Sequence, residues 1–246
     1  MSSKYSNDGS HLVVPDDPLQ TLINCEGCYV CPVSADGSLR GPIVGYTGTY
    51  DDGGVRRNFV GLTYFNFSAA DQWPSVLSLF AEEAISNLMS CSLDPTVILG
   101  APWAGIKFSQ EVAQLFGCRH IFAEKGEKGL FLGRYEGAIR ENDAVVIGEE
   151  LVNNLSTTEE LCRIVEGAGA RIVGIVSAIN RSYPFRDRFL FYGSSIPILA
   201  VIERETPQYR QDDPVVAASV AEGNVVWKPK YGWLKLRDAM NGADTQ

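Results

Sequence analysis

Residues 143–179 read DAVVIGEELVNNLSTTEELCRIVEGAGARIVGIVSAI. An apolar run from Asp143 to Ile147 gives way to a polar turn, and the residues from Thr157 to Ala168 then follow the pattern of a helix that Gly169 closes. A second apolar run occupies Arg171 to Ile179. A strand, a helix and a strand in this order predict a right-handed βαβ unit with parallel strands.

The same alternation continues on both sides of this stretch. We expect a strand at Thr96–Leu99, a helix at Gly105–Phe116, a strand at Arg119–Ala123 and a last strand at Ile196–Ile202, all preceded by a helix over residues 75–88. This rhythm predicts an α/β fold with a parallel sheet flanked by helices on both faces. In such sheets ligands bind beyond the carboxyl ends of the strands, so functional residues are sought there.

The chain divides into three predicted regions. Residues 1–70 form an N-terminal arm and an antiparallel β hood, because turn-forming residues such as Asp36-Gly37 and the cluster at 51–54 separate short apolar runs. Residues 71–205 form the α/β core. Residues 206–246 form a C-terminal helical tail that we expect to pack on the core.

Composition limits the classes of function. The chain has 246 residues, 45% of them hydrophobic, and a net charge of −9, which argues against general nucleic-acid binding because that needs clustered cations. The sequence contains no run of about 20 apolar residues, the length a membrane span needs. Its first residues also lack the apolar core of a signal peptide. We therefore expect a cytoplasmic protein without a membrane partner.

Three cysteines, Cys25, Cys28 and Cys31, share the motif CEGCYVC and have the spacing of metal ligands. A closed zinc site takes four ligands, and the chain offers only His11 and Cys91 at a distance. Two interpretations stay open. The favoured one is a strand with reduced thiols, and the other is a zinc or iron–sulfur site that would give the protein a structural or metal-binding role.

Polar residues follow four of the predicted strands. Gly100 to Gly105 can bring backbone amides close to an anion, and the segment from Glu124 to Gly129 is a Gly-rich loop with two lysines. Glu149-Glu150 come after the strand that ends at Ile147, and Arg181 comes after the strand that ends at Ile179. These groups suit a ligand that carries both a sugar and phosphates.

Four segments in this order resemble the type I phosphoribosyltransferases, and the orotate phosphoribosyltransferases in particular. VILGAPWAGI (97–106) resembles the family's pyrophosphate loop, and FAEKGEKG (122–129) resembles its catalytic loop. AVVIGEELVNNLSTTEEL (144–161) stands in place of the phosphoribosyl-diphosphate signature, and AINRSY (178–183) carries an arginine where the family has an orotate contact. Upstream, TYFNF (63–67) resembles the aromatic segment beside the base.

The resemblance implies transfer of ribose 5-phosphate from phosphoribosyl diphosphate to orotate or a related base, as in pyrimidine biosynthesis. The implied catalytic residues are Lys125 and Lys128, which with Mg²⁺ would stabilise the leaving pyrophosphate, and Glu149 and Glu150, which would hold the ribose hydroxyls directly or through the metal. The implied substrate-binding residues are Ala101, Trp103, Ala104, Gly105, Asn154, Ser156, Thr157, Thr158, Arg181, Tyr64 and Phe65. The family also implies a homodimer in which the lysine loop of one subunit covers the site of its neighbour.

The signature departs from the family pattern at several positions. Glutamates replace the paired aspartates at Glu149-Glu150, Leu155 replaces a small residue, and Glu124 stands where an arginine is usual. Residues Ser156 to Glu159 also fit a helix capping box, which would use the Ser156 hydroxyl that the resemblance assigns to phosphate. A second interpretation therefore remains, namely a protein of this fold that binds a nucleotide or phosphoribosyl ligand as a regulator, without catalysis.

Overall fold

The computed structural model describes residues 17–241, which fall into two compact units. The first unit combines residues 20–70 with residues 206–241, and the second is formed mainly by residues 71–205. Most of the predicted N-terminal arm, including His11, lies outside the described residues. Within residues 17–241, no helix is both long enough and apolar enough to cross a membrane.

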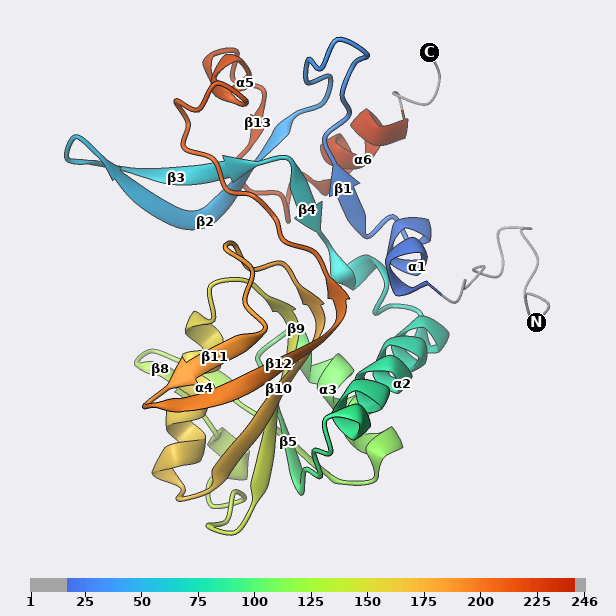
Figure 1. Ribbon diagram of the computed structural model, residues 1–246, viewed down its shortest axis with the longest axis vertical. Coiled ribbons are helices and arrows are strands. Elements are labelled where there is room, and N and C mark those ends of the chain that lie inside the picture. Colours follow the sequence, from blue (N-terminus) through green and yellow to red (C-terminus); the bar gives the residue numbers. More distant parts are fainter. Residues whose placement is uncertain (1–16, 242–246) are drawn as a thin grey trace. The chain divides into compact units, whose positions relative to one another are not determined.

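The second unit is built on a six-stranded sheet with the order β11, β12, β10, β9, β5, β6 (Figure 1). Neighbouring strands run parallel, except that the edge strand β11 pairs antiparallel with β12. The strands are β5 (Val97–Gly100), β6 (Arg119–Phe122), β9 (Ala144–Val152), β10 (Arg171–Asn180), β11 (Arg188–Phe191) and β12 (Ser194–Glu203). The predicted parallel sheet is confirmed, with β11 as an addition.

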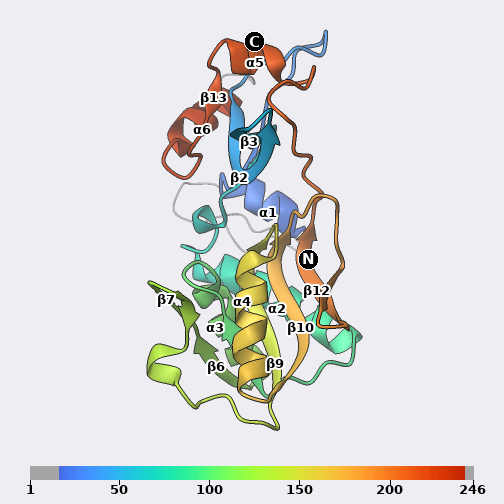
Figure 2. The same cartoon turned by 90° about the vertical axis from the view of Figure 1, so that its left-hand side faces the viewer.

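Helices cover both faces of this sheet, which is why its central strands are almost continuously apolar. α2 (Pro74–Ser90) and α3 (Gly105–Phe116) pack together on one face, and α4 (Ser156–Gly167) lies on the other, in front of the sheet in Figure 2. Successive residues of β9 face these two helical layers in turn. A Cβ at Gly148 would lie 2.5 Å from the Cβ of Ser109 on α3, whereas the next residue, Glu149, contacts Thr158 on α4.

A short hairpin follows β6 and includes β7 (Glu124–Gly126) and β8 (Gly129–Phe131). It corresponds to the predicted lysine loop, so this loop is a hairpin in the structure. The amide of Leu130 donates a hydrogen bond to Oε2 of Glu160 on α4 at 3.0 Å. A helical turn, η2 (Gly133–Tyr135), then leads towards β9.

The first unit contains two small sheets. The long antiparallel hairpin of β2 (Ile43–Asp52) and β3 (Val55–Gly61) turns at Gly53 and Gly54, both of which have positive φ, as the sequence predicted. A separate antiparallel pair joins β1 to β4. The remaining elements of the first part of the chain are β1 (Cys28–Val30), β4 (Thr63–Phe65), α1 (Pro18–Asn24) and η1 (Phe67–Ala69).

The C-terminal segment belongs to the first unit and not to the core, where we predicted it would pack. It is only partly helical, because β13 (Val225–Val226) lies between α5 (Ala217–Ala221) and α6 (Trp233–Asn241). β13 pairs parallel with β2, with Val225 opposite Ile43. The buried side chains of Val216, Val225, Val226 and Leu236 join Tyr29, Ile43 and Val44 in one hydrophobic cluster. The hood is therefore assembled from both ends of the described chain.

The three cysteines of CEGCYVC are all buried and reduced. Cys28 begins β1, as the strand interpretation requires, and burial raises the pKa of the Cys25 thiol to about 11. Among residues 17–241 there is no group of three or more His, Cys, Asp or Glu side chains that could hold a metal ion.

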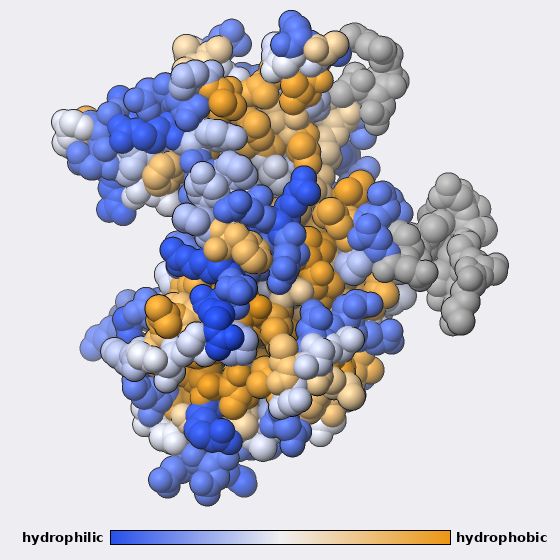
Figure 3. Space-filling view, viewed as in Figure 1, coloured by the Kyte–Doolittle hydropathy of each residue, from blue (hydrophilic) through white to orange (hydrophobic). Residues whose placement is uncertain are grey.

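On the face shown in Figure 3, apolar side chains gather over β10 and β12 of the second unit. At the neighbouring edge of the sheet, Leu190 and Tyr192 are each 74% exposed.

Candidate functional site

The carboxyl end of β5 and the start of α3 meet the middle of β9. The amide of Ala101 donates to the carbonyl of Gly148 at 2.9 Å, which continues the sheet into the loop of residues 101–104. A Cβ on Gly105 would lie 2.9 Å from that same carbonyl oxygen and 3.3 Å from the amide nitrogen of Glu150. The structure thus brings the predicted pyrophosphate loop against the backbone of the acidic pair.

The side chains of this loop differ in exposure. Ala101 is buried, Ala104 is exposed, and Trp103 is 62% exposed. The peptide bond between Pro102 and Trp103 is cis. Lys107, in the first turn of α3, makes an ion pair with Asp71 at 3.2 Å.

The acidic pair lies inside β9 and not beyond its end. We expected the strand to end at Ile147, but its pairing with β10 continues to Val152. Successive residues of a strand point to opposite faces, so Glu149 points towards α4 and Glu150 points towards α3 and the loop. The two carboxylates therefore point to opposite faces of the sheet. The side-by-side pair that the sequence suggested does not form.

Glu149 is buried, with 8% of its surface exposed, and its Oε1 accepts a hydrogen bond from the Thr158 hydroxyl at 2.6 Å. Burial raises the pKa of Glu149 to about 7, although the Thr158 bond acts in the opposite direction. Thr158 itself is 1% exposed. The two side chains thus share one buried hydrogen bond, and the predicted roles of Thr158 as a phosphate ligand and of Glu149 as a metal ligand stay predictions.

The start of α4 has an unusual backbone. Leu155 precedes the first helical residue with φ 64°, in the left-handed region, and its side chain is buried in the hydrophobic core of the second unit. The predicted capping box does not form, because the amide and hydroxyl of Ser156 both donate to Oδ1 of Asn154. The Leu155 side chain thus points away from the exposed side of the turn, where Asn154 and Ser156 lie.

Arg181 follows β10, and its amide donates to the carbonyl of Val152 at the end of β9. This places Arg181 at the same edge of the sheet as the turn into α4. Its side chain is 7% exposed. Its predicted contact with the base stays a prediction.

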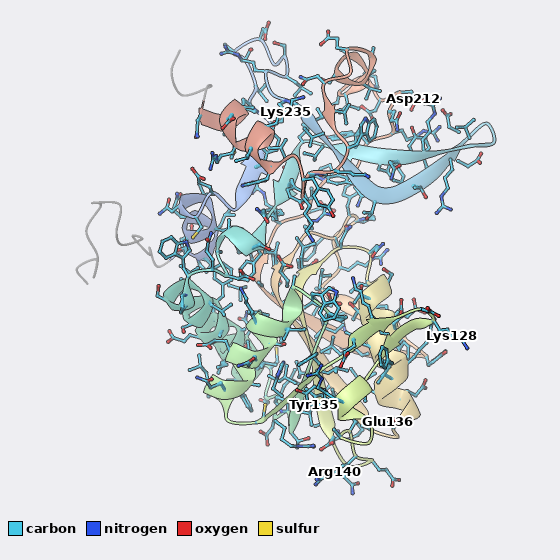
Figure 4. The ribbon with its side chains drawn as sticks, turned by 180° about the vertical axis from the view of Figure 1, so that it is seen from behind. Lys128, Tyr135, Glu136, Arg140, Asp212 and Lys235 are labelled. Carbon is cyan, nitrogen blue, oxygen red and sulfur yellow. The ribbon has the colours of Figure 1, made fainter. Side chains whose placement is uncertain are left out.

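Both lysines that the resemblance makes catalytic are exposed on the hairpin. Lys125 lies in β7 opposite Leu130, and Lys128 lies at the tip, directed away from the rest of its unit in Figure 4. Glu124, where the family usually has an arginine, makes an ion pair with Arg134 at 3.2 Å. Its negative charge is thus partly balanced within the chain. The predicted role of the lysines stays a prediction.

The two aromatic residues predicted to lie beside the base belong to the first unit. Phe65 is 4% exposed, and the ring of Tyr64 lies 6.0 Å from the ring of Trp233. Tyr64 packs against the hydrophobic cluster of the hood, and the role of both residues in base binding stays a prediction.

The sequence did not single out two polar residues near the site. Ser109 on α3 lies 2.9 Å from Nε2 of His120 on β6, below the loop, where burial lowers the pKa of His120. Ser177 on β10 is fully buried and lies directly opposite Glu149 in the sheet register. Neither lies in a local motif: the packing of α3 on β6 brings Ser109 to His120, and the pairing of β9 with β10 brings Ser177 opposite Glu149.

Known proteins are similar to this chain in sequence and in fold. No protein-family model matches the chain. The orotate phosphoribosyltransferase of Heliobacterium modesticaldum is 28% identical over 129 residues, which cover 50% of this chain and 64% of the relative, less than two thirds of its length. The orotate phosphoribosyltransferase of Caldanaerobacter subterraneus subsp. tengcongensis is 24% identical over 152 residues, covering 61% of this chain and 75% of the relative.

A solved structure shares the fold. The orotate phosphoribosyltransferase from Aeropyrum pernix superposes with a TM-score of 0.52 at 10% identity, covering 75% of this chain and 92% of that chain. The chain therefore has the type I phosphoribosyltransferase fold and is related in sequence to the orotate phosphoribosyltransferases.

Proposed function

We propose that this protein transfers ribose 5-phosphate from phosphoribosyl diphosphate to orotate or a related base. The observation that carries the proposal is the contact of Gly105 with the backbone of Gly148 and Glu150. This contact sets the amide-rich loop at the carboxyl end of β5 beside the backbone of Glu150, whose residue is partly exposed. The similarity to orotate phosphoribosyltransferases supports the proposal.

In the proposed reaction the amides of residues 101–105 bind the pyrophosphate, and the start of α4 binds the 5′-phosphate. Helix amino termini favour anions because their amides point outwards and the helix dipole is positive there. Asn154, Ser156 and Thr157 lie at this end of α4. Lys125 and Lys128 stabilise the charge that grows on the leaving pyrophosphate.

Mg²⁺ fits one carboxylate of the acidic pair. This ion keeps several waters and binds one or two carboxylates together with substrate phosphates. Glu150 is partly exposed beside the loop and meets this requirement, whereas the carboxyl of Glu149 is buried against Thr158. Glu150 and the oxygens of the donor would hold Mg²⁺, which when bound supplies positive charge to the leaving group.

Pyrophosphate release tests the proposal. Purified protein is incubated with phosphoribosyl diphosphate, Mg²⁺ and either orotate, uracil, adenine or no base. We expect release that depends on a pyrimidine base, with orotate the most effective. Release with adenine alone would overturn the choice of base, and no release with any base would overturn the transferase activity.

A non-catalytic ligand-binding protein is the second candidate. The burial of Glu149, which leaves Glu150 alone at the loop, favours it. This candidate predicts that the protein binds phosphoribosyl diphosphate or a nucleotide in calorimetry but releases no pyrophosphate. The homodimer and the cytoplasmic location are part of the first proposal, and light scattering of the pure protein tests the dimer.

A further inference from the structure

A small polar cluster lies in the core between β9, β10 and α4. Its members are Glu149, Thr158 and Ser177, each less than 10% exposed. Ser177 is opposite Glu149 on the neighbouring strand, and its hydroxyl has no hydrogen-bond partner among the described residues. Burying a polar group without a hydrogen-bond partner costs free energy. A buried polar cluster in the core therefore needs an explanation, and the hydrogen bond between Glu149 and Thr158 is the contact to consider.

This bond connects the sheet to the first turn of α4. Thr158 is the third residue of the helix, two positions after Ser156, and its hydroxyl donates to Oε1 of Glu149 at 2.6 Å. The backbone just before the helix takes the left-handed conformation at Leu155. Ser156 is bonded to Asn154 within this turn, whereas the Thr158 bond ties the first turn of the helix to the sheet. A side chain that fixes Thr158 therefore helps to fix the direction of the first helical amides.

The length of the side chain matters. An aspartate at position 149 would withdraw the carboxyl by roughly one carbon–carbon bond, about 1.5 Å. The distance to Thr158 would then exceed that of a hydrogen bond unless the backbone moved. The glutamate at this position is thus long enough to reach the helix, where an aspartate is not.

The other acidic residue points elsewhere. Because Gly148 faces Ser109 on α3, Glu150 shares that face, and its amide lies close to Gly105. Glu149 faces α4 and cannot reach the loop without leaving Thr158. The Glu149 carboxylate therefore lies on the face of the sheet covered by α4, and the Glu150 carboxylate lies on the face covered by α3.

We propose that Glu149 is a positioning residue that holds the phosphate-binding turn of α4 through Thr158, and that Glu150 alone of the pair contacts the ribose. This inference rests on the proposed function for its ligand, but its structural part can be measured without one. In this proposal Glu149 supports the binding of the phosphate, and Glu150 binds the ribose.

Binding of two probes distinguishes the roles. Inorganic phosphate reports on the turn alone, and ribose 5-phosphate reports on the turn and the ribose contact together. In calorimetry we expect Thr158→Val and Glu149→Asp to weaken the binding of both probes by about tenfold, because either change removes the hydrogen bond that positions the turn. Glu149→Gln, whose amide oxygen still accepts from Thr158, should stay within about threefold of the parent protein for both probes.

Glu150→Gln should behave differently, with ribose 5-phosphate weakened about tenfold and inorganic phosphate unchanged. Glu166→Gln, an exposed charge removal on the same helix, is the matched control and should change neither probe. The proposal is overturned if Glu149→Gln weakens ribose 5-phosphate but not phosphate. That pattern would make Glu149 a ribose ligand.

Hydrogen exchange of the amides of residues 159–162, whose hydrogen bonds to the carbonyls four residues earlier close the first turn of α4, gives an independent result. Thr158→Val should speed exchange there while the amides of β5 and β6 keep their rates, and Glu149→Gln should not. Unchanged exchange in Thr158→Val overturns the positioning role. If the parent protein binds neither probe, the proposed function fails, and the exchange data alone decide the role of Glu149.

Discussion

Gly105 lies so close to Gly148 that a Cβ on Gly105 would be 2.9 Å from the Gly148 carbonyl oxygen. Real Cβ atoms essentially never come so close to a backbone atom. The nearby Gly148 oxygen and Glu150 nitrogen are both backbone atoms, so neither can move away as a flexible side chain could. This approach sets the distance between the loop and the acidic pair.

Gly105→Ala should therefore push the loop away from β9. We expect the free energy of unfolding to fall by about 1–3 kcal/mol, as for other overpacked sites, and the affinity for pyrophosphate to fall with it. Denaturant unfolding and calorimetry measure the two effects. Gly167→Ala is the control, because a Cβ at this helical glycine meets nothing within 4 Å and should be neutral or stabilising. Equal stability of the two variants would contradict the close contact.

The buried Glu149 carboxyl should make stability depend on pH. Its pKa is raised from 4.5 to about 7, so between these values the folded protein keeps a proton that the unfolded chain has released. The free energy of unfolding should then fall as the pH rises from 4.5 to 7, by at most about 3 kcal/mol from this residue.

Denaturant unfolding in the presence of EDTA, at half-unit pH steps, tests this expectation. Glu149→Gln should flatten the fall, and its difference from the parent protein isolates the contribution of this carboxyl. Parallel curves for the two proteins would show that Glu149 is ionised in the fold at neutral pH.

Ser177 and Ser109 form a natural pair for comparison. The hydroxyl of Ser177 is buried without a partner among the described residues, whereas that of Ser109 contacts His120 and the carbonyl of Ile106. Ser177→Ala should leave the free energy of unfolding unchanged or raise it by about 1 kcal/mol, and Ser109→Ala should lower it by about 1 kcal/mol. The same sign for both variants, measured by thermal unfolding, would contradict the assigned contacts.

Lys125→Ala should depress turnover far more than stability. The side chain is exposed, so we expect a change of no more than about 0.5 kcal/mol in the free energy of unfolding. Loss of a cation that stabilises a leaving group should lower kcat by about 100-fold. Lys235→Ala, an exposed lysine on α6, is the control. Unchanged turnover of Lys125→Ala at saturating donor would remove this loop from the catalytic mechanism.

Much of the second unit could be predicted because its signals are local. The predicted helix at Gly105–Phe116 has the observed bounds, and Gly117 ends it with φ 85°. Strands such as β5 were found because residues buried on both faces read as one apolar run. The four site segments followed from their place at the ends of such runs.

The sequence was less informative where tertiary contacts overrule local preference. The sequence predicted a loop at Glu149 and Glu150, because charged residues seldom occur inside a buried strand. In the structure both lie within β9, and the Thr158 hydroxyl is the hydrogen-bond partner of the buried Glu149. Leu155 adopts a backbone that usually needs glycine because its side chain gains burial in the core. No pattern of neighbouring residues encodes these contacts.

The pairing of β13 with β2 has a consequence for biosynthesis. Val225 pairs with Ile43 across most of the length of the chain, while the second unit is nearly continuous in sequence. As the ribosome extends the chain, the second unit can fold first. The hood strands are made earlier, but their sheet is complete only after β13 has been synthesised. A nascent chain halted at Glu205 would leave Ile43 and Val44 without that cover, exposed to chaperones and proteases.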